Sequence, residues 1–196
     1  ARRHTNVLMH ILGYLKKHLN GADKQELLEL IEGYRLDRVP RIVPLEEFTP
    51  LSSSVDPALK RIELHLDRQE LTAYEDQIPV YSARISSGKK VYGRYTTPLG
   101  RFMTFHKRHS RHMAAGNLAS GGYDLPGVPW VTYITKGEVS FHGTFWHNDL
   151  GTPHSHGCIN LSAQDAKWLY RWTIPSVPPE EQYVYESFGT RVEISE

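Results

Sequence analysis

The chain contains one cysteine, Cys158, and three histidines lie close to it in sequence at His142, His154 and His156. A single thiol cannot form a disulfide within its own chain, so it is either an inert side chain or a reactive one. A nearby imidazole can generate the thiolate that acts as a nucleophile. Gly157 comes directly before the cysteine and lets the backbone approach a substrate closely. We therefore predict that Cys158 is a nucleophile assisted by a histidine.

The segments around these residues predict how they meet. Residues 138–142 alternate as in a strand, which places His142 on the face opposite the apolar residues, away from the core. Residues 148–153 are rich in turn formers, so they can return the chain and bring Cys158 to His142. The amides of Gly157 and Cys158 would then point at an acyl oxygen, an arrangement worth roughly 3–4 kcal/mol per donor.

A longer motif is similar to that of a known family. His142-Gly143, followed by Ser155-His156-Gly157-Cys158-Ile159-Asn160, resembles the signature of the YkuD-type L,D-transpeptidases. The resemblance extends from about residue 59 to residue 194, roughly two thirds of the chain. Further segments that resemble strands and small-residue turns of the family lie at 61–66, 71–74, 86–88, 97–102 and 189–194. Asn160 stands where many members carry Arg, a departure that bears on the choice of acceptor and not on catalysis.

The resemblance implies a role for each residue of the motif. Cys158 would be the acylated nucleophile and His142 its general base, with the carbonyl of Gly143 orienting the imidazole. His156, Gly157 and Cys158 itself would line the oxyanion hole. These five residues are the catalytic set that the resemblance predicts.

The substrate-binding residues are expected on the turn before the cysteine and on a cleft wall. Ser155 would support the turn, and Asn160 follows the nucleophile. We expect residues 92–130 to be mostly irregular, because they are rich in Gly, His and Arg, and the corresponding region of the family caps the substrate cleft. The candidate substrate-binding residues are Ser155, Asn160, Tyr92, His112, Tyr123 and Trp130.

The reaction implied by the resemblance is two-step acyl transfer in cell-wall cross-linking or anchoring. The thiol attacks a peptide-stem carbonyl of peptidoglycan and expels a D-amino acid, and an amine of a neighbouring stem then takes the acyl group. The resemblance also implies carbapenem-type β-lactams as covalent inhibitors. It implies no metal or organic cofactor, and a location outside the cytoplasm, in the periplasm or cell wall.

Other interpretations of the same residues stay open. One is a hydrolase on the same scaffold, an L,D-carboxypeptidase or amidase, in which water replaces the acceptor amine. Another is a non-catalytic wall-binding or zinc-binding module, since imidazoles and a thiolate suit zinc. The five residues that would serve zinc, all within seventeen positions, are His142, His147, His154, His156 and Cys158. Their alternating spacing differs from that of structural zinc sites.

The predicted fold is mainly β, an L,D-transpeptidase-like β-sandwich or partly open barrel with one short helix, preceded by an N-terminal helical hairpin. Ser162, followed three residues later by Asp165, predicts the start of the short helix, which we expect to continue to about Tyr170. We expect two parts: residues 1–50, with a Pro-rich linker, and a catalytic domain over residues 51–196.

The N-terminal part has a different pattern. Apolar residues between Val7 and Leu19 follow one helical face, and the first 47 residues or so resemble a fragment of the YbgA-like domain of unknown function. Two short helices cannot bury such a face alone, so self-association through them is a candidate role. A net charge of +1 lacks the excess of positive charge that is typical of nucleic-acid-binding proteins. We expect no membrane span and no signal peptide in this chain.

Overall fold

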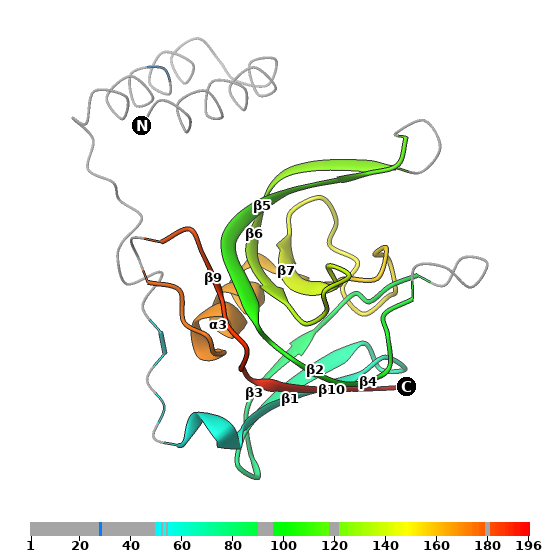
Figure 1. Ribbon diagram of the computed structural model, residues 1–196. Helices are drawn as coiled ribbons and strands as arrows, with labels where there is room; N and C mark the ends of the chain where they lie inside the picture. Colours follow the sequence, from blue (N-terminus) through cyan, green and yellow to red (C-terminus); the bar gives the residue numbers. More distant parts are fainter. Residues whose placement is uncertain are drawn as a thin grey trace. The chain divides into compact units, whose positions relative to one another are not determined.

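The computed structural model describes residues 28, 50, 51, 53, 55–89, 96–117, 122–178 and 181–196 (Figure 1). The chain divides into two units, Ala1–Glu47 and Phe48–Glu196, and nearly all of the described residues belong to the second. The predicted N-terminal helices lie outside the described residues apart from Leu28, and so does Tyr92. In the parts of the chain that are described, no helix is long and apolar enough to cross a membrane.

The first of two sheets joins segments that are distant in sequence. Its strands, in order, are β3 (Ile78–Arg84), β2 (Glu70–Glu75), β1 (Lys60–His65), β10 (Arg191–Ser195) and β4 (Gly100–Met103). A 3-10 turn, η2 (Pro57–Leu59), leads into β1. The β1 and β10 strands are parallel, and the other pairs are antiparallel. Alternate residues of β1 and β10 are buried, as expected for strands with one face on a core.

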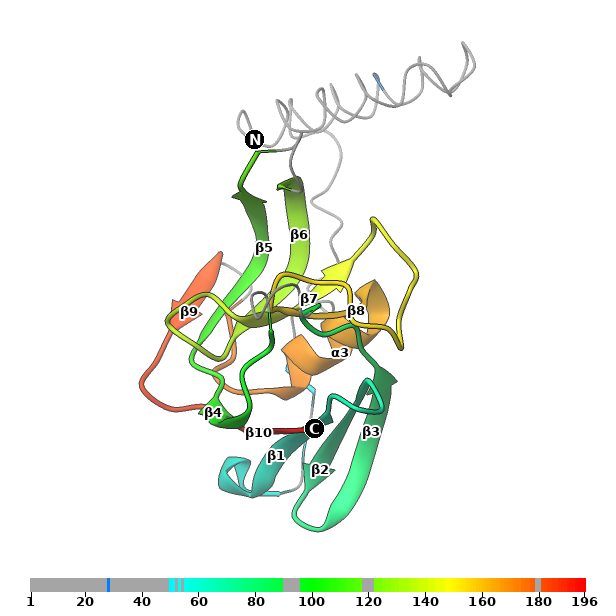
Figure 2. The ribbon, with the colours of Figure 1, turned by 90° about the vertical axis from the view of Figure 1, so that its right-hand side faces the viewer.

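The second sheet carries the cysteine motif. Its strands, in order, are β8 (Ile159–Ser162), β7 (Ser140–Thr144), β6 (Tyr123–Tyr133), β5 (His106–Ala115) and β9 (Tyr183–Tyr185). The β7 and β8 strands are parallel, whereas β5 and β6 form a long antiparallel pair that curves away from the rest of the sheet (Figure 2). The mainly β prediction is confirmed: the described part of residues 55–196 forms two sheets and one short α-helix, and its sheets do not close into a barrel.

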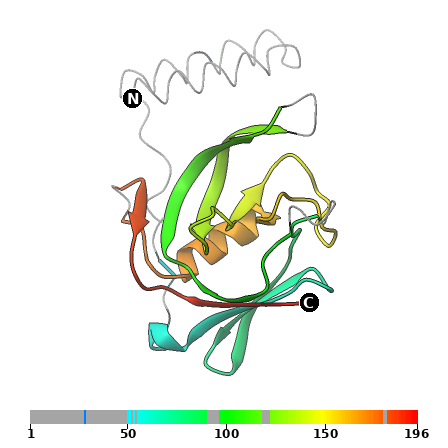
Figure 3. The same ribbon diagram turned by 45° about the vertical axis from the view of Figure 1, so that its right-hand side comes forward.

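The helix α3 (Ala163–Trp172) lies between the two sheets (Figure 3). One hydrophobic core contains residues of both sheets and of the helix, among them Ile62, Val192, Phe141, Ile159 and Leu169. The first turn confirms the capping prediction, because the Ser162 hydroxyl accepts a hydrogen bond from the Asp165 amide at 3.0 Å. On its outer face, Trp168 stacks on Tyr81 of β3 with ring centroids 3.9 Å apart.

Two buried lysines, one from each sheet, close the carboxyl end of α3. Lys60 on β1 donates to the Trp172 carbonyl at 3.1 Å. Lys107 on β5 donates to the Tyr170 carbonyl and, at 2.9 Å, to the Thr173 carbonyl. Ammonium groups satisfy the last carbonyls of a helix and interact favourably with its dipole. The pair therefore fixes the helix to both sheets.

The prediction that residues 92–130 are mostly irregular is wrong for the part that is described. Strands β4, β5 and most of β6 occupy that region. Two features concealed them in the sequence. The first seven residues of β5 are polar, and β6 contains Pro126, Gly127 and Pro129, which disfavour a regular strand. Gly127 has a φ of 69°, and the register shifts between Arg111 and Met113, so the hairpin accommodates these residues at an irregularity.

Gly143 on β7 permits the close approach of the helix and the hairpin. A β-carbon there would lie 2.9 Å from the Pro129 Cγ and 3.2 Å from the Ala163 Cα. We predict that Gly143→Ala lowers the free energy of unfolding by about 1–3 kcal/mol, the usual cost of overpacking. Urea denaturation measures it. Gly137→Ala is the control, because its nearest neighbour would be the Thr135 hydroxyl at 3.8 Å. Equal stability of the two variants would contradict the prediction.

Candidate active site

The parallel pairing of β7 and β8 brings the two parts of the motif together. His142 pairs with Asn160, and Phe141 pairs with Ile159. Cys158, the residue before β8, therefore lies beside the start of β7, where the Ser140 hydroxyl is 3.7 Å from its sulfur. Phe141 points into the core, while Ser140 and His142 occupy the other face of the strand, as the alternation predicted.

A cavity of about 240 Å³ opens over this face. Its polar side is formed by the motif, with His142, His154, Ser155, His156, Cys158 and Asn160. Its other side is largely apolar and comes from the hairpin and the loop after β7, with Met113, Tyr123, Leu125 and Trp146. A thiol and an imidazole thus face a pocket with one polar and one apolar wall, which is the usual composition of a small-ligand site.

Cys158 is partly exposed, and its sulfur has two polar neighbours on the chain around the start of β7. Besides Ser140, the thiol donates to the Glu138 carbonyl at 3.6 Å. Burial raises the pKa of the thiol, while the hydrogen bond from Ser140 acts in the opposite direction. The cysteine is therefore a protonated thiol at neutral pH.

The His142 imidazole is almost completely buried, with 3% of its surface exposed. Its Nδ1 lies 3.3 Å from the Gly143 carbonyl. A carbonyl only accepts, so Nδ1 carries the proton and Nε2 keeps its lone pair. Burial lowers the pKa of His142 to about 4, partly offset by the Gly143 bond and lowered further by His147. At neutral pH this imidazole is uncharged and able to accept a proton.

The turn before Cys158 is held by side-chain hydrogen bonds. The Ser155 hydroxyl donates to the Cys158 carbonyl at 2.5 Å and accepts from the Gly157 amide at 3.1 Å. Gly157 has a φ of 120°, a conformation that other residues rarely adopt, and Thr97 donates to its carbonyl at 2.9 Å. Ser155 supports the turn as expected. The Gly157 amide, predicted to point at an acyl oxygen, is instead occupied by Ser155.

Hydrogen bonds to residues outside the motif also hold this turn. The amides of His154 and Ser155 both donate to the Ser87 carbonyl, at 2.9 and 3.0 Å. The Ser87 backbone is in turn fixed by Gln69, which is buried and accepts from the Ser87 amide at 2.8 Å. Sequence reasoning missed Gln69 and Thr97, because their role depends on contacts across the fold. It also gave Ser140 no role, although its alternation with His142 was a usable signal.

The hydrogen bonds of His147 determine how the Asn160 amide points. His147 accepts from the Asp149 amide at Nδ1, 3.2 Å away, and its Nε2 lies 2.8 Å from the Asn160 amide group. A neutral imidazole has one acceptor nitrogen, so Nε2 carries the proton and donates to the Asn160 oxygen. With this assignment, the other terminal atom of the Asn160 amide group, which is buried and has no partner among the described residues, is the nitrogen. Asn160 therefore offers an amide donor at the cavity wall.

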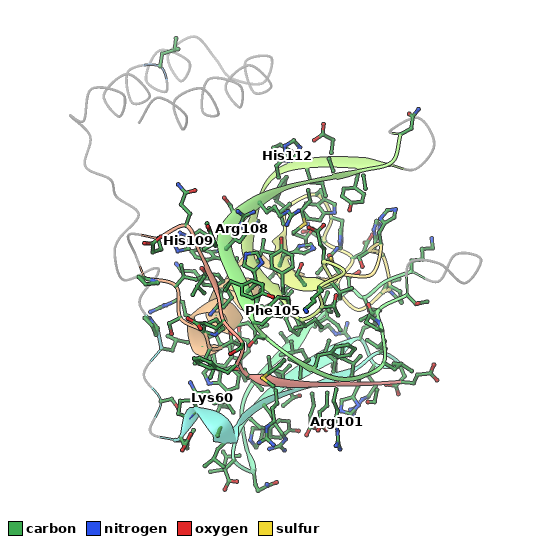
Figure 4. All side chains as sticks on the ribbon, in the orientation of Figure 1. Lys60, Arg101, Phe105, Arg108, His109 and His112 are labelled. Carbon is green, nitrogen blue, oxygen red and sulfur yellow. The ribbon has the colours of Figure 1, made fainter. Side chains whose placement is uncertain are left out.

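The structure brings together some of the predicted substrate-binding residues and not others. Tyr123, Ser155 and Asn160 line the cavity. His112 on β5 does not line the cavity and pairs with Asp124 of β6. Figure 4 shows it well beyond Phe105, the residue just before β5. Trp130 packs against the hydrophobic core, with its ring 5.4 Å from that of Tyr170. Tyr92 is outside the described residues.

The zinc interpretation requires at least three ligand side chains that converge. Within residues 55–89, 96–117, 122–178 and 181–196, no group of three His, Cys, Asp or Glu side chains is arranged to hold a metal ion. His147 and His154 stack face to face, with ring centroids 4.4 Å apart, and His147 is engaged by Asn160.

The family comparison agrees with this geometry. The model of the L,D-transpeptidase catalytic domain, YkuD, matches residues 59–194, which include both sheets, the helix and the cavity. The chain belongs to the YkuD family. A second family model, a protein of unknown function (DUF1722), matches residues 1–58.

Individual relatives support the same division of the chain. YciB of Bacillus subtilis (strain 168), provisionally named an L,D-transpeptidase, is 29% identical over 138 residues, covering 63% of this chain and 68% of YciB. The uncharacterized protein YbgA of Escherichia coli (strain K12) is 46% identical over 44 residues, covering 22% of this chain and 26% of YbgA. The YkuD match and the YbgA match confirm the two family resemblances that the sequence shows.

Solved structures share the fold of the YkuD part. An L,D-transpeptidase from Mycobacterium smegmatis has a TM-score of 0.58 at 25% identity, covering 71% of this chain and 59% of that one. L,D-transpeptidase 3 from Mycobacterium tuberculosis, in complex with a faropenem-derived adduct, has a TM-score of 0.56 at 22% identity, covering 70% of this chain and 60% of that one. The chain thus spans about three fifths of the length of these structures.

The depressed pKa of His142 predicts a pH dependence of stability. The folded-state pKa of about 4 lies below the ordinary value of 6.5, so between these pH values the unfolded chain binds the extra proton. This group should therefore cost about 3 kcal/mol of stability as pH falls from 6.5 to 4, and nothing more below that. Urea denaturation of the wild type and His142→Gln measures the difference. Parallel pH profiles for the two proteins would contradict it.

Proposed function

We propose that this YkuD-family protein is a cysteine-dependent acyltransferase that acts on peptide stems of peptidoglycan. The observation that carries the proposal is the placement of the Cys158 thiol and the uncharged His142 imidazole on one cavity wall, in the order and spacing of the family motif. Membership of the family supports an enzyme, and the polar and apolar cavity walls suit an extended peptide. The substrate places the protein outside the cytoplasm.

The first step forms a thioester. His142 accepts the thiol proton as the Cys158 sulfur attacks the stem carbonyl carbon. The bond between that carbon and the D-amino acid nitrogen then breaks, and the departing amine takes the proton from the imidazolium. Because both groups are uncharged at rest, proton transfer accompanies attack instead of preceding it. The Cys158 amide and the Asn160 side chain are our candidate donors to the developing oxyanion and to a second stem carbonyl.

The second step transfers the acyl group to an acceptor. An amine from a neighbouring stem attacks the thioester carbon and loses a proton to His142. The carbon–sulfur bond breaks, and the sulfur regains its proton from the imidazolium. The reaction replaces one amide with another, so it needs neither a redox cofactor nor a nucleotide. Water in place of the amine would give hydrolysis through the same intermediate.

Reaction with β-lactams gives a direct test of the nucleophile. Solved relatives include an L,D-transpeptidase in complex with imipenem and an avibactam carbamoyl enzyme, so this chemistry is compatible with the fold. We predict that imipenem acylates Cys158: the sulfur–carbon bond forms, the ring carbon–nitrogen bond breaks, and no group leaves. Intact-mass spectrometry should therefore show one adduct with the full mass of the inhibitor.

The variants in this experiment separate the roles of the residues. Cys158→Ala should form no adduct, and His142→Ala should react about 10²–10⁴-fold more slowly, as expected for loss of a positioned base. His147→Ala is the matched histidine control and should lose much less. An adduct that persists in Cys158→Ala would remove the covalent mechanism. Equal losses in the two histidine variants, reversed by zinc, would favour a metal site.

Product analysis tests the reaction itself. Incubation with a tetrapeptide stem and an amine acceptor, followed by liquid chromatography and mass spectrometry, should give a cross-linked product and a free D-amino acid. Cys158→Ala should give neither. A tripeptide as the sole product, with the acceptor present, would identify the protein as an L,D-carboxypeptidase. No turnover by a protein that still forms the imipenem adduct would show that the substrate class is wrong and the nucleophile right.

A further inference from the structure

The turn between β6 and β7 brings a charged pair to the sulfur side of the active site. Glu138 lies in this turn with a φ of 68°, a left-handed conformation that few residues other than glycine adopt. Its amide donates to the Thr135 carbonyl at 3.2 Å, and Thr135 also binds the Val139 amide through its hydroxyl at 3.1 Å. This turn directs the Glu138 carbonyl at the Cys158 sulfur, 3.6 Å away.

Arg111 on β5 holds the side chain of Glu138. One guanidinium nitrogen donates to the Glu138 carboxylate at 2.6 Å, and another donates to the Tyr133 hydroxyl at 2.7 Å. These two hydrogen bonds hold the guanidinium between Glu138 and Tyr133. A second cavity of about 280 Å³, lined by Arg111, Glu138, Tyr133 and His106 among others, borders the pair. Glu138 therefore faces the thiol with its backbone carbonyl, while its side chain and that of Arg111 line the second cavity.

These two charges act on Cys158 with opposite signs. The Glu138 carboxylate raises the pKa of the thiol, and the Arg111 guanidinium lowers it, in addition to the larger effect of burial. The other titratable groups near the sulfur are uncharged at neutral pH: burial raises the pKa of Tyr123, and burial lowers that of His142 to about 4. His154 and His156 also line the cavity, on the same wall as Cys158. The Arg111–Glu138 ion pair therefore supplies charges of both signs on the Glu138 side of the thiol.

We propose that Arg111 and Glu138 are positioning residues that set the ionisation of Cys158, with the guanidinium favouring the thiolate and the carboxylate opposing it. Neither residue belongs to the family motif described above. The inference rests on the nucleophilic role proposed for Cys158, but it concerns the thiol and not the substrate. It assigns a catalytic purpose to the turn directly before β7 and to a strand, β5, that is distant from the motif in sequence.

The lone cysteine makes the inference testable without a substrate. Iodoacetamide is uncharged and reacts with the thiolate, so its rate as a function of pH reports the ionisation of Cys158 alone. We expect Glu138→Gln to lower the midpoint pH by about half a unit and Arg111→Gln to raise it by about as much. At pH 7 these shifts correspond to about threefold faster and threefold slower alkylation. The double variant should return close to the wild type.

The chain offers a matched control on the other sheet. Arg61 and Glu63 form an ion pair of similar length, 2.9 Å, on β1. Arg61→Gln and Glu63→Gln should leave the alkylation profile unchanged. Salt of about 1 M should reduce the shifts caused by Arg111 and Glu138, because it screens charges beyond about 3 Å.

The sign of the shifts decides the outcome. A purely structural role would change both single variants in the same direction, and this result or the absence of any shift would overturn the proposal. Arg111→Lys keeps the charge without the two-sided bond and should stay near the wild-type midpoint. If Arg111→Gln fails to fold, Glu138→Gln alone still tests the inference. The Glu138 side chain is 64% exposed, so this variant should fold. A higher midpoint pH of alkylation in Glu138→Gln would contradict the inference. Imipenem acylation of the same variants tests the proposed function separately.

Discussion

The parallel pairing of β7 with β8 is the constraint on which the active site depends. Parallel neighbours cannot be joined by a tight turn and need a long connection. Here the connection, residues 145–158, returns the chain to the same end of the sheet and also supplies Trp146, His154 and Ser155 to the cavity wall. The topology that places His142 and Cys158 together therefore also builds the pocket around them. Helix α3 follows β8 directly and covers the opposite side.

Burial gives this site its electrostatic character. It raises the pKa of the thiol and lowers that of His142, so the resting pair is uncharged. In the proposed mechanism, the nucleophile is therefore generated only as a substrate is attacked, which differs from cysteine enzymes that store a thiolate–imidazolium pair. A protonated thiol is also slow to oxidise, because susceptibility to oxidation follows thiolate character.

The sequence and the structure agree where local rules determine the outcome. The Ser162 cap, the alternation in β1 and β7, and the cysteine motif could all be predicted, because each depends on neighbouring residues. The β5–β6 hairpin could not be predicted. Its strands are held by backbone pairing, they show no apolar alternation, and β6 contains proline. Gln69 was equally hidden, because its role arises from contact with Ser87 across the fold. The pKa of His142 depends on burial, which no motif encodes.

The pairing of β1 with β10 has a consequence for how the domain assembles. Arg61 pairs with Arg191, so two neighbouring strands of the first sheet are separated in sequence by nearly the whole domain. Ordering such a distant contact requires a large loss of chain entropy before any packing compensates for it, whereas the β2–β3 and β5–β6 hairpins can form locally. The first sheet is therefore incomplete until β10 inserts between β1 and β4. The core beneath α3 contains Val192 and Ile194 of this strand, so the support of the cavity depends on a strand that contributes no residue to it.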